Sequence, residues 1–214
     1  MTFQNTPISR RQAIATAAAL AAPTLLQGAH AQSVWPNRPL KIVVGFPGGS
    51  SPDLTARLLA EPLQQALGQP VVIENRPGAG GNIAAAQVAR ADDDHTIGLM
   101  INGNMTIAKI LNPATTYDPL SDLTPVSLIA VAPLVLAAPA DAPATGAAFM
   151  DAARAAGDKW NYGTPGVGTV AHLGMELLKS RAGIAPVHVP YPGNPQVITA
   201  MLGGQVQMSL LPPG

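Results

Sequence analysis

The chain has 214 residues, of which 47% are hydrophobic and 11% charged, and its 12 basic side chains balance 12 acidic ones. This balance excludes a strongly basic surface of the kind that binds nucleic acid, and we expect no nucleic-acid partner. The absence of cysteine excludes disulfides, thiolate metal sites and a lipid-modified N-terminal cysteine.

Residues 1–31 are typical of an export signal peptide, which the mature protein loses. Arg10 and Arg11 are its only charges, an apolar run covers residues 13–26, and small residues mark a cleavage site near Ala31. The run is shorter than the ~20 residues of a membrane-spanning helix. We therefore expect a soluble periplasmic protein. The arginine pair also fits a twin-arginine signal, and the sequence leaves the export route open.

The first half of the mature chain predicts strands that alternate with helices. Residues 40–46 are apolar and rich in β-branched side chains, as in a strand buried on both faces. A helix is expected from Asp53 to Gly68, and Pro62 is expected to kink or restart it. Further elements are expected at 71–73 (strand), 82–90 (helix) and 96–101 (strand). Such alternation predicts a parallel α/β sheet.

The second half repeats this pattern after a proline-rich crossover at residues 139–143. Residues 126–138, interrupted at Pro133, predict a strand or a pair of strands. Beyond the crossover we expect helices at 145–156, at 170–181 and from Pro195, and strands at 160–163, 187–189 and 205–210. The expected organisation is a signal peptide at 1–31, an N-terminal α/β lobe at 32–138 and a C-terminal α/β lobe at 139–214. No covering helix follows the last strand, so we expect the second lobe to be incomplete.

Four proline-glycine turns each join a strand-like run to a helix-like one. Glycine lets the backbone approach a ligand closely, and the helix that follows offers free N–H groups and the positive end of its dipole. Taken alone, each turn is equally compatible with ordinary strand-to-helix punctuation. Two turns fall in each expected lobe, which favours an anion site between the lobes. The four turns are residues 47–49, 77–81, 165–168 and 192–194.

Seven short stretches occur together in an order that is specific for one family, although each alone would be weak. They are residues 35–39, 46–53, 74–82, 117–119, 166–169 with 172–173, 188–191 and 202–206. On these stretches the chain resembles the tripartite tricarboxylate transporter receptors, the TctC or Bug family of periplasmic solute-binding proteins. It departs from that pattern at residues 92–96, where relatives carry Pro-Asp-Gly-Tyr-Thr, and relatives continue beyond the length of this chain.

The resemblance implies a periplasmic-binding-protein-like fold of type II, a Venus flytrap, in which two α/β lobes close on a small carboxylate. It implies a membrane permease of the tripartite tricarboxylate type as partner, a monomer, and no metal, cofactor or catalytic residue. Ligand contacts fall in the four turns, with residues 102–104 as a further candidate. The candidate ligand-binding residues are Phe46, Gly48, Gly49, Ser50, Ser51, Asp53, Gly78, Gly80, Gly81, Asn82, Asn102, Asn104, Gly166, Gly168, Thr169, His172, Tyr191, Gly193 and Asn194.

Some of these residues have a structural alternative that the sequence leaves open. Asp53 suits the start of a helix, where the dipole favours a carboxylate, as well as it suits a ligand contact. His172 and His188 are also compatible with packed, hydrogen-bonded histidines. Arg76 is compatible with a surface ion pair. The glycines at 78–81 lack the spacing of a dinucleotide fingerprint, so we exclude one.

The function that this reasoning favours is an extracytoplasmic solute receptor that delivers a carboxylate to a permease. An alternative is a truncated relative that does not transport and is either inert or a partner-binding module. A third is a hydrolase with Ser50 or Ser51 as nucleophile and His172 or His188 as base, for which the sequence offers no nucleophile elbow and no orienting third group.

Overall fold

The computed structural model describes residues 35–213. The chain divides into two units, residues 1–37 and 38–214, and the fold discussed here is that of the second unit. The expected signal peptide lies outside the described residues. Within residues 35–213, none of the helices combines the length and the apolar character that crossing a membrane requires.

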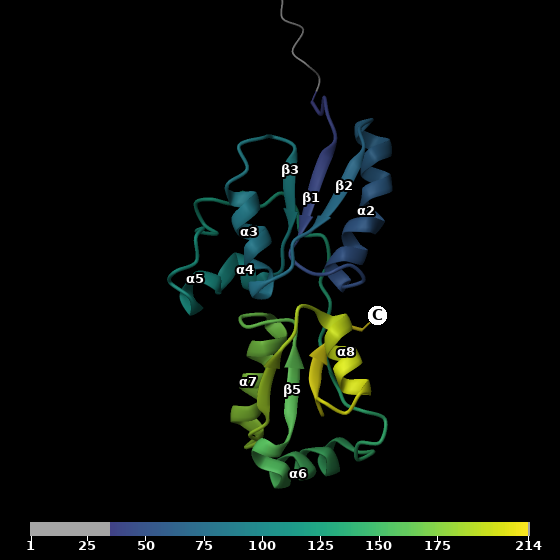
Figure 1. The fold of residues 1–214 in the computed structure, drawn as a ribbon, viewed down its shortest axis with the longest axis vertical. Coiled ribbons are helices and arrows are strands. Elements are labelled where there is room, and N and C mark those ends of the chain that lie inside the picture. Colours follow the sequence, from purple (N-terminus) through teal and green to yellow (C-terminus); the bar gives the residue numbers. More distant parts are fainter. Residues whose placement is uncertain (1–34, 214) are drawn as a thin grey trace, which may run out of the picture. The chain divides into compact units, whose positions relative to one another are not determined.

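The N-terminal lobe is built on a parallel sheet of three strands (Figure 1). Strand β1 (Leu40–Val44) lies between β2 (Val71–Asn75) and β3 (Thr96–Leu99). Helix α2 (Ser51–Leu67) packs on β1 and β2, and α3 (Asn82–Ala89) packs on β1 and β3. Because the two crossovers run in opposite directions along the sheet, right-handed connections place α2 and α3 on opposite faces. A short 3-10 helix, η2 (Ala79–Gly81), precedes α3, and α4 (Asn102–Thr106) and α5 (Ala108–Leu111) follow β3.

Helix α2 runs through Pro62 as one helix, so of the two predicted effects of this proline a restart of the helix is excluded. A proline in a helix removes the hydrogen bond to the carbonyl four residues earlier, which here belongs to Leu58. Leu58 is 78% exposed, so water can bind that carbonyl instead. The helix ends where expected, at Gly68, which adopts the left-handed conformation that glycine tolerates best.

The C-terminal lobe repeats the strand-turn-helix pattern. Strand β5 (Asn161–Thr164) pairs in parallel with β6 (Val187–Pro190), and α7 (Val170–Ala182) connects them. Helix α8 (Asn194–Leu202) packs on β5, while α6 (Gly146–Ala156) and the 3-10 helix η3 (Gly157–Lys159) precede that strand. One buried cluster of this lobe contains Phe149 of α6, Tyr162 of β5, Met175 of α7 and Met208, which forms a bridge with Tyr162.

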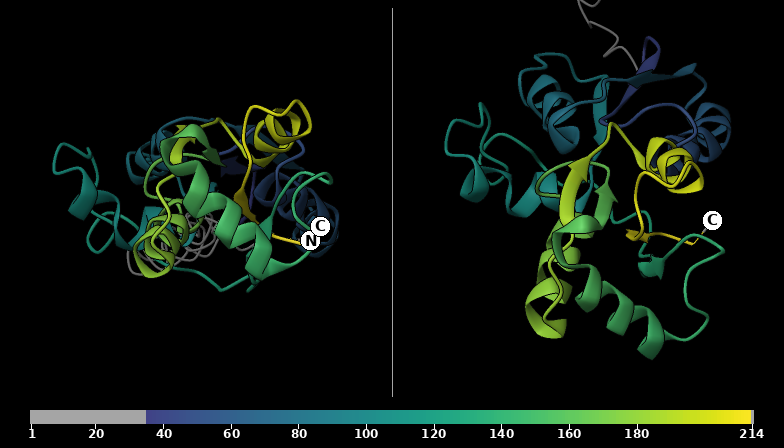
Figure 2. Two further views of the ribbon diagram at one scale, coloured as in Figure 1. Left: turned by 90° about the horizontal axis from the view of Figure 1, so that it is seen from below. Right: turned by 60° about the horizontal axis from the view of Figure 1, so that its bottom comes forward.

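The last strand departs from the parallel arrangement. Strand β7 (Ser209–Leu211) pairs antiparallel with β4 (Val135–Ala137), and the two lie side by side in Figure 2. Strand β4 precedes the lobe boundary expected between residues 138 and 139, yet its partner lies near the end of the chain. That boundary stays a prediction.

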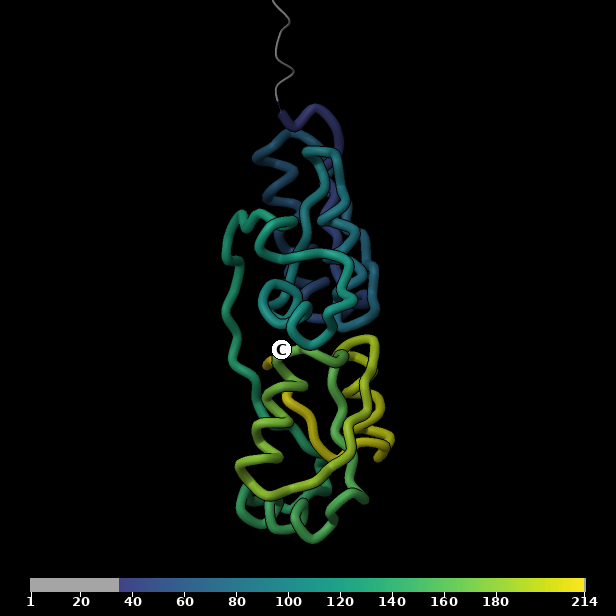
Figure 3. Tube along the Cα trace, turned by 90° about the vertical axis from the view of Figure 1, so that its left-hand side faces the viewer, coloured from purple at the N-terminus to yellow at the C-terminus, as the bar shows by residue number. Residues whose placement is uncertain are grey.

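The expected strand at residues 126–138 is wrong for most of its length, because only β4 forms. The segment before β4 runs without regular structure between the lobes, from teal to green in Figure 3. Pro125 and Pro133 cannot donate a backbone hydrogen bond, which disfavours a strand here. Val126, Leu128 and Val131 in this segment are each at least 80% exposed, so the apolar run is not a buried one.

Gly45 lies directly after β1, where this strand closely approaches the second glycine turn. A Cβ atom at position 45 would lie 2.6 Å from the Cα atom of Gly81 and 2.9 Å from its carbonyl oxygen. We expect Gly45→Ala to lower the free energy of unfolding by about 1–3 kcal/mol, the usual cost of overpacking, measured by urea denaturation. Gly146→Ala is the matched control, because nothing lies within 4 Å of a Cβ atom there. Equal losses in the two variants would contradict this account.

Candidate ligand-binding site

Two cavities lie between the lobes and share Pro165 in their walls. The larger has a volume of about 600 Å³ and is lined mainly by the second and third glycine turns. The smaller has a volume of about 160 Å³ and is lined by residues on either side of the first turn and by the starts of several helices. The structure therefore gathers segments that are distant in sequence around one region.

The candidate residues divide into three groups. Six line the larger cavity: Gly78, Gly80, Asn82, Gly166, Gly168 and Tyr191. Six line the smaller cavity: Phe46, Ser50, Ser51, Asn102, Thr169 and Asn194. Seven line neither: Gly48, Gly49, Asp53, Gly81, Asn104, His172 and Gly193. No ligand contact has been tested for any of them, so each ligand-binding role stays a prediction.

The smaller cavity is distinguished by the helices that begin at its wall. Ser51 starts α2, Val170 starts α7 and Asn194 starts α8. The first N–H groups of a helix lack partners within the helix, and the helix dipole places partial positive charge at that end. Of residues 35–213, no charged side chain lines this cavity. Its electrostatic character therefore comes from backbone dipoles, which favour an anion.

Apolar side chains complete the same wall. Phe46, Ile101, Leu134 and Leu210 line the smaller cavity beside the helix starts. Such a combination of a few polar groups with apolar surface is usual for small-molecule sites, where the polar groups orient the ligand and the apolar groups hold its carbon skeleton. Ile101, Leu134 and Leu210 were not predicted as site residues, because their apolar runs gave no signal other than core or strand.

The second and third glycine turns approach each other from opposite lobes. A Cβ atom at Gly166 would lie 2.9 Å from the Cα atom of Gly80, and one at Gly80 would lie 2.7 Å from the carbonyl oxygen of Val167. Side chains larger than hydrogen would separate the turns. These two glycines therefore also serve the contact between the lobes, a role that their sequence spacing does not reveal.

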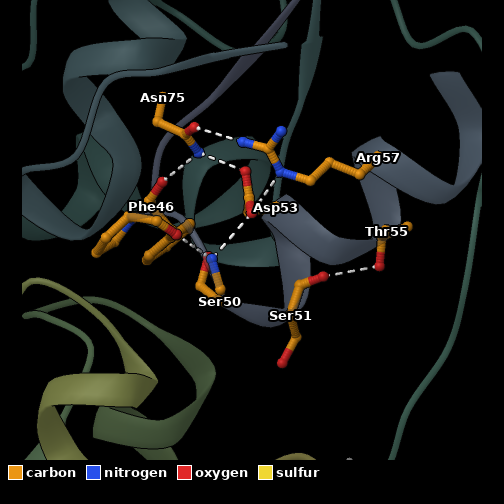
Figure 4. Close-up of polar contacts among 9 residues, drawn as sticks. Phe46, Ser50, Ser51, Asp53, Thr55, Arg57 and Asn75 are labelled. Carbon is orange, nitrogen blue, oxygen red and sulfur yellow. Dashed lines mark hydrogen bonds and ion pairs between the residues drawn. The ribbon is translucent and has the colours of Figure 1, made fainter.

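A network around Asp53 fixes the first turn (Figure 4). The buried carboxylate accepts hydrogen bonds from N–H of Gly49 at 2.9 Å, from Nε of Arg57 at 2.9 Å and from Nδ2 of Asn75 at 2.8 Å. Burial would raise the pKa of Asp53, but the hydrogen bonds from Arg57, Gly49 and Asn75 outweigh it and lower the pKa. These contacts engage the Asp53 carboxylate at the start of α2, as expected for a residue that stabilises the start of a helix.

The same network reaches the backbone through Asn75. Its Nδ2 atom also donates to the carbonyl oxygen of Phe46 at 2.9 Å. The hydroxyl of Ser50 donates to the carbonyl oxygen of Pro47 at 2.7 Å, so this side chain stabilises the turn too. Asn75 was predicted only as part of a family motif, since its partners lie 18 or more residues away in the sequence.

The second turn is held by buried amides and a tyrosine. Nδ2 of Asn104 donates to the carbonyl oxygen of Gly80 at 3.0 Å and to Oδ1 of Asn82 at 2.7 Å. The hydroxyl of Tyr117 donates to the carbonyl oxygen of Asn104 at 2.8 Å and lies 3.0 Å from Oδ1 of Asn82. Residues 102–104, expected as a loop, form the first turn of α4. Asn104 thus supports the turn from behind.

The fourth turn presents an unpaired acceptor. Oδ1 of Asn194 is buried and makes no hydrogen bond within the part of the chain that the structure describes. A buried polar atom without a partner is energetically costly, so a donor that reached this oxygen would bind favourably. Because Asn194 lines the smaller cavity, a donor group on a ligand is such a partner.

The network around Asp53 can be tested through Asn75. Asn75→Ala removes a donor from both the Asp53 carboxylate and the Phe46 carbonyl, so we expect the free energy of unfolding to fall by about 1–3 kcal/mol. Gln65→Ala is the control, because its amide donates to an exposed glutamate on the same helix, Glu61. That control should change stability by less than about 0.5 kcal/mol. Urea denaturation measures both, and similar losses would show that Asn75 does not hold the turn.

Comparisons with known proteins identify the family of this chain. The family model described as tripartite tricarboxylate transporter family receptor, TctC, matches residues 55–212. A UPF0065 protein of Bordetella pertussis is 38% identical over 207 residues, covering 96% of this chain and 62% of that protein. The chain thus spans about three fifths of the length of the curated relatives it matches.

Solved structures give the same result. The periplasmic binding protein BugD has a TM-score of 0.78 at 31% identity, covering 83% of this chain and 60% of BugD. MatC from Rhodopseudomonas palustris with bound malate has a TM-score of 0.76 at 33% identity, covering 83% of this chain and 61% of MatC. The expected periplasmic-binding-protein-like α/β fold is confirmed. The chain belongs to the TctC family of tripartite tricarboxylate transporter receptors.

Proposed function

We propose that the protein is an extracytoplasmic solute receptor that binds a small carboxylate between its lobes and delivers it to a membrane permease of the tripartite tricarboxylate type. One observation carries the proposal: α2 from one lobe and α7 and α8 from the other begin at a single cavity without charged lining side chains. Such a site suits an anion held by fixed dipoles. The export signal expected at residues 1–31 supports a periplasmic location.

Micromolar binding of an acid requires contacts from both lobes. Three charge-assisted hydrogen bonds contribute ~1.5–3 kcal/mol each, and two helix starts contribute ~0.3–2 kcal/mol each. Association costs at least ~4 kcal/mol. Groups from α2 alone would leave almost nothing after this cost, whereas micromolar affinity corresponds to about −8 kcal/mol. Binding is therefore expected to depend on contacts from both sides of the cavity.

The proposed ligand carries a hydrogen-bond donor close to its carboxylate. Asn194 offers a buried oxygen acceptor in the smaller cavity, and a hydroxyl or ammonium group on the ligand would satisfy it. The structure of MatC holds malate, a hydroxy acid. We extend only the class to this chain, namely small acids with a polar substituent, and the adjoining larger cavity gives room for the remainder of the molecule.

We propose no enzymatic activity, because the groups of the hydrolase alternative have other partners. The hydroxyl of Ser50 donates to the carbonyl of Pro47, Nδ1 of His172 accepts from Gly168, and Nε2 of His188 lies beside the hydroxyl of Thr164. The hydrogen bonds of both histidines are made within the C-terminal lobe, whereas both serines belong to the N-terminal lobe. A nucleophile and a base must share a hydrogen bond, and these contacts do not provide one.

Calorimetric titration of the purified chain tests the receptor function. With a panel of dicarboxylates, tricarboxylates and amino acids we expect micromolar binding of at least one acid, and tighter binding of malate than of succinate, which lacks the hydroxyl. Ser51→Phe fills the smaller cavity and should weaken that binding at least about tenfold. Leu58→Phe, on the exposed side of the same helix, should leave it unchanged.

Two results would contradict the proposal. One is a folded sample that binds no acid in the panel, which would favour the alternative of an inert or partner-binding relative. The other is equal weakening by Ser51→Phe and Leu58→Phe, which would place the ligand elsewhere.

A further inference from the structure

Two histidines stack against each other behind the third glycine turn. His172 lies on α7 and His188 on β6, and their ring centroids are 4.4 Å apart with an interplanar angle of 28°. The ring of Tyr162, on β5, stacks on His188 with centroids 4.8 Å apart. Neither histidine lines the two cavities. The pair therefore forms a cluster of titratable groups outside the proposed ligand site.

His172 nevertheless bonds directly to the turn that borders that site, and His188 contacts the turn through the side chain of Thr164. N–H of Gly168 donates to Nδ1 of His172 at 3.3 Å. Nε2 of His188 lies 2.7 Å from the hydroxyl oxygen of Thr164, and this oxygen accepts from N–H of Gly166 at 3.3 Å. The segment at 165–169 lines both cavities. The positions of its backbone N–H groups thus depend on two imidazole rings.

The first of these bonds constrains the protonation state of His172. An imidazole nitrogen accepts a hydrogen bond only while it carries no proton, and both nitrogens of a charged histidine are donors. Protonation at Nδ1 would set that N–H against the N–H of Gly168. Protonation of both rings would also bring two positive charges to within a few ångströms of each other, where they repel. The observed arrangement therefore requires a neutral His172 and disfavours a charge on both rings at once.

We propose that His172 and His188 are positioning residues that hold the third glycine turn in its ligand-binding form only while they are neutral, so that the receptor releases its ligand in acid. This inference rests on the proposed function for its effect on ligand affinity. The coupling between the histidines and the turn does not depend on the proposed function, because this coupling follows from the hydrogen bonds alone.

The surroundings of the pair favour the neutral forms at neutral pH. Burial lowers the pKa of His172, and within α7 the charge of Glu176 opposes this shift while that of Lys179 adds to it. Burial lowers the pKa of His188 to about 4, with His172 and Lys179 adding to the shift and Glu176 opposing it. From β5, the hydroxyl of Tyr162 donates to Glu176, and Lys179 lies 5.3 Å from the centre of the tyrosine ring.

The sign of the pH effect follows from these shifts. An unperturbed histidine has a pKa of about 6.5, so the two histidines bind protons more readily when the turn is released from them than when it is ordered. The stabilisation of the ordered turn is complete above about pH 6.5 and is lost as the pH falls toward about 4, the pKa of His188. A protein in a medium that becomes acidic would pass through this pH range.

The test compares three chains at about pH 7.5 and about pH 5, with malate as the probe. In the unaltered chain we expect malate affinity to fall about tenfold at the lower pH. His172→Gln supplies an amide oxygen that accepts from Gly168 at either pH, so the affinity of this variant should depend on pH less than that of the unaltered chain. His172→Leu supplies no acceptor and should bind weakly at both. Malate titrates equally in all samples, so differences between chains report on the protein.

A second readout needs no ligand. The NMR chemical shift of the Gly168 amide should change with pH in the unaltered chain and change less in His172→Gln, while the amide of Ile42 in β1 serves as an internal control. A pH response of Gly168 that is the same in both chains overturns the proposal. If no acid binds to any chain, the proposed function fails, and the Gly168 amide still decides whether the histidines hold the turn.

Discussion

The arrangement of this protein depends on one constraint, namely that the first N–H groups of a helix have no partner within that helix. In a parallel α/β lobe every helix that follows a strand begins at the same edge of the sheet, so these unpaired groups gather there. In this chain α2 begins at that edge of one lobe, and α7 and α8 begin at that edge of the other, around a single cavity. The cavity therefore concentrates partial positive charge without any charged lining side chain.

Backbone dipoles can favour an anion in the cavity only if the turns that carry them are rigid, and buried side chains provide that rigidity. Asp53 and Asn75 hold the first turn, Asn104 and Tyr117 hold the second, and His172 binds the third. The negative charge of Asp53 would oppose a bound anion, but Arg57 bonds to the carboxylate directly. The polar groups that hold the first three turns are thus paired within each lobe.

The sequence predicted the order of strands and helices well, because apolar β-branched runs and proline-glycine turns are local signals. It could not show which side chains hold the turns, since the partners of Asn75 and Tyr117 lie between 13 and 35 residues away and no spacing encodes such pairs. The strand expected at 126–138 was wrong because an apolar run does not reveal whether a neighbouring strand is available. Helix α2 passes through Pro62 because the affected carbonyl belongs to an exposed residue, Leu58, and exposure is not a property of local sequence.

A site built from dipoles has a consequence that a site built from arginine or lysine would not share. A charged side chain attracts an anion from one lobe alone, whereas each helix start contributes at most ~2 kcal/mol, less than the ~4 kcal/mol that association costs. In the proposed receptor, separation of the lobes would therefore remove enough of the binding energy to release the ligand. Neutral turns that meet at Gly80 and Gly166 also approach each other without charge repulsion. Because the dipoles of one lobe bind the ligand only weakly, binding is coupled to closure of the two lobes. A protein that must both bind and release its ligand requires such coupling.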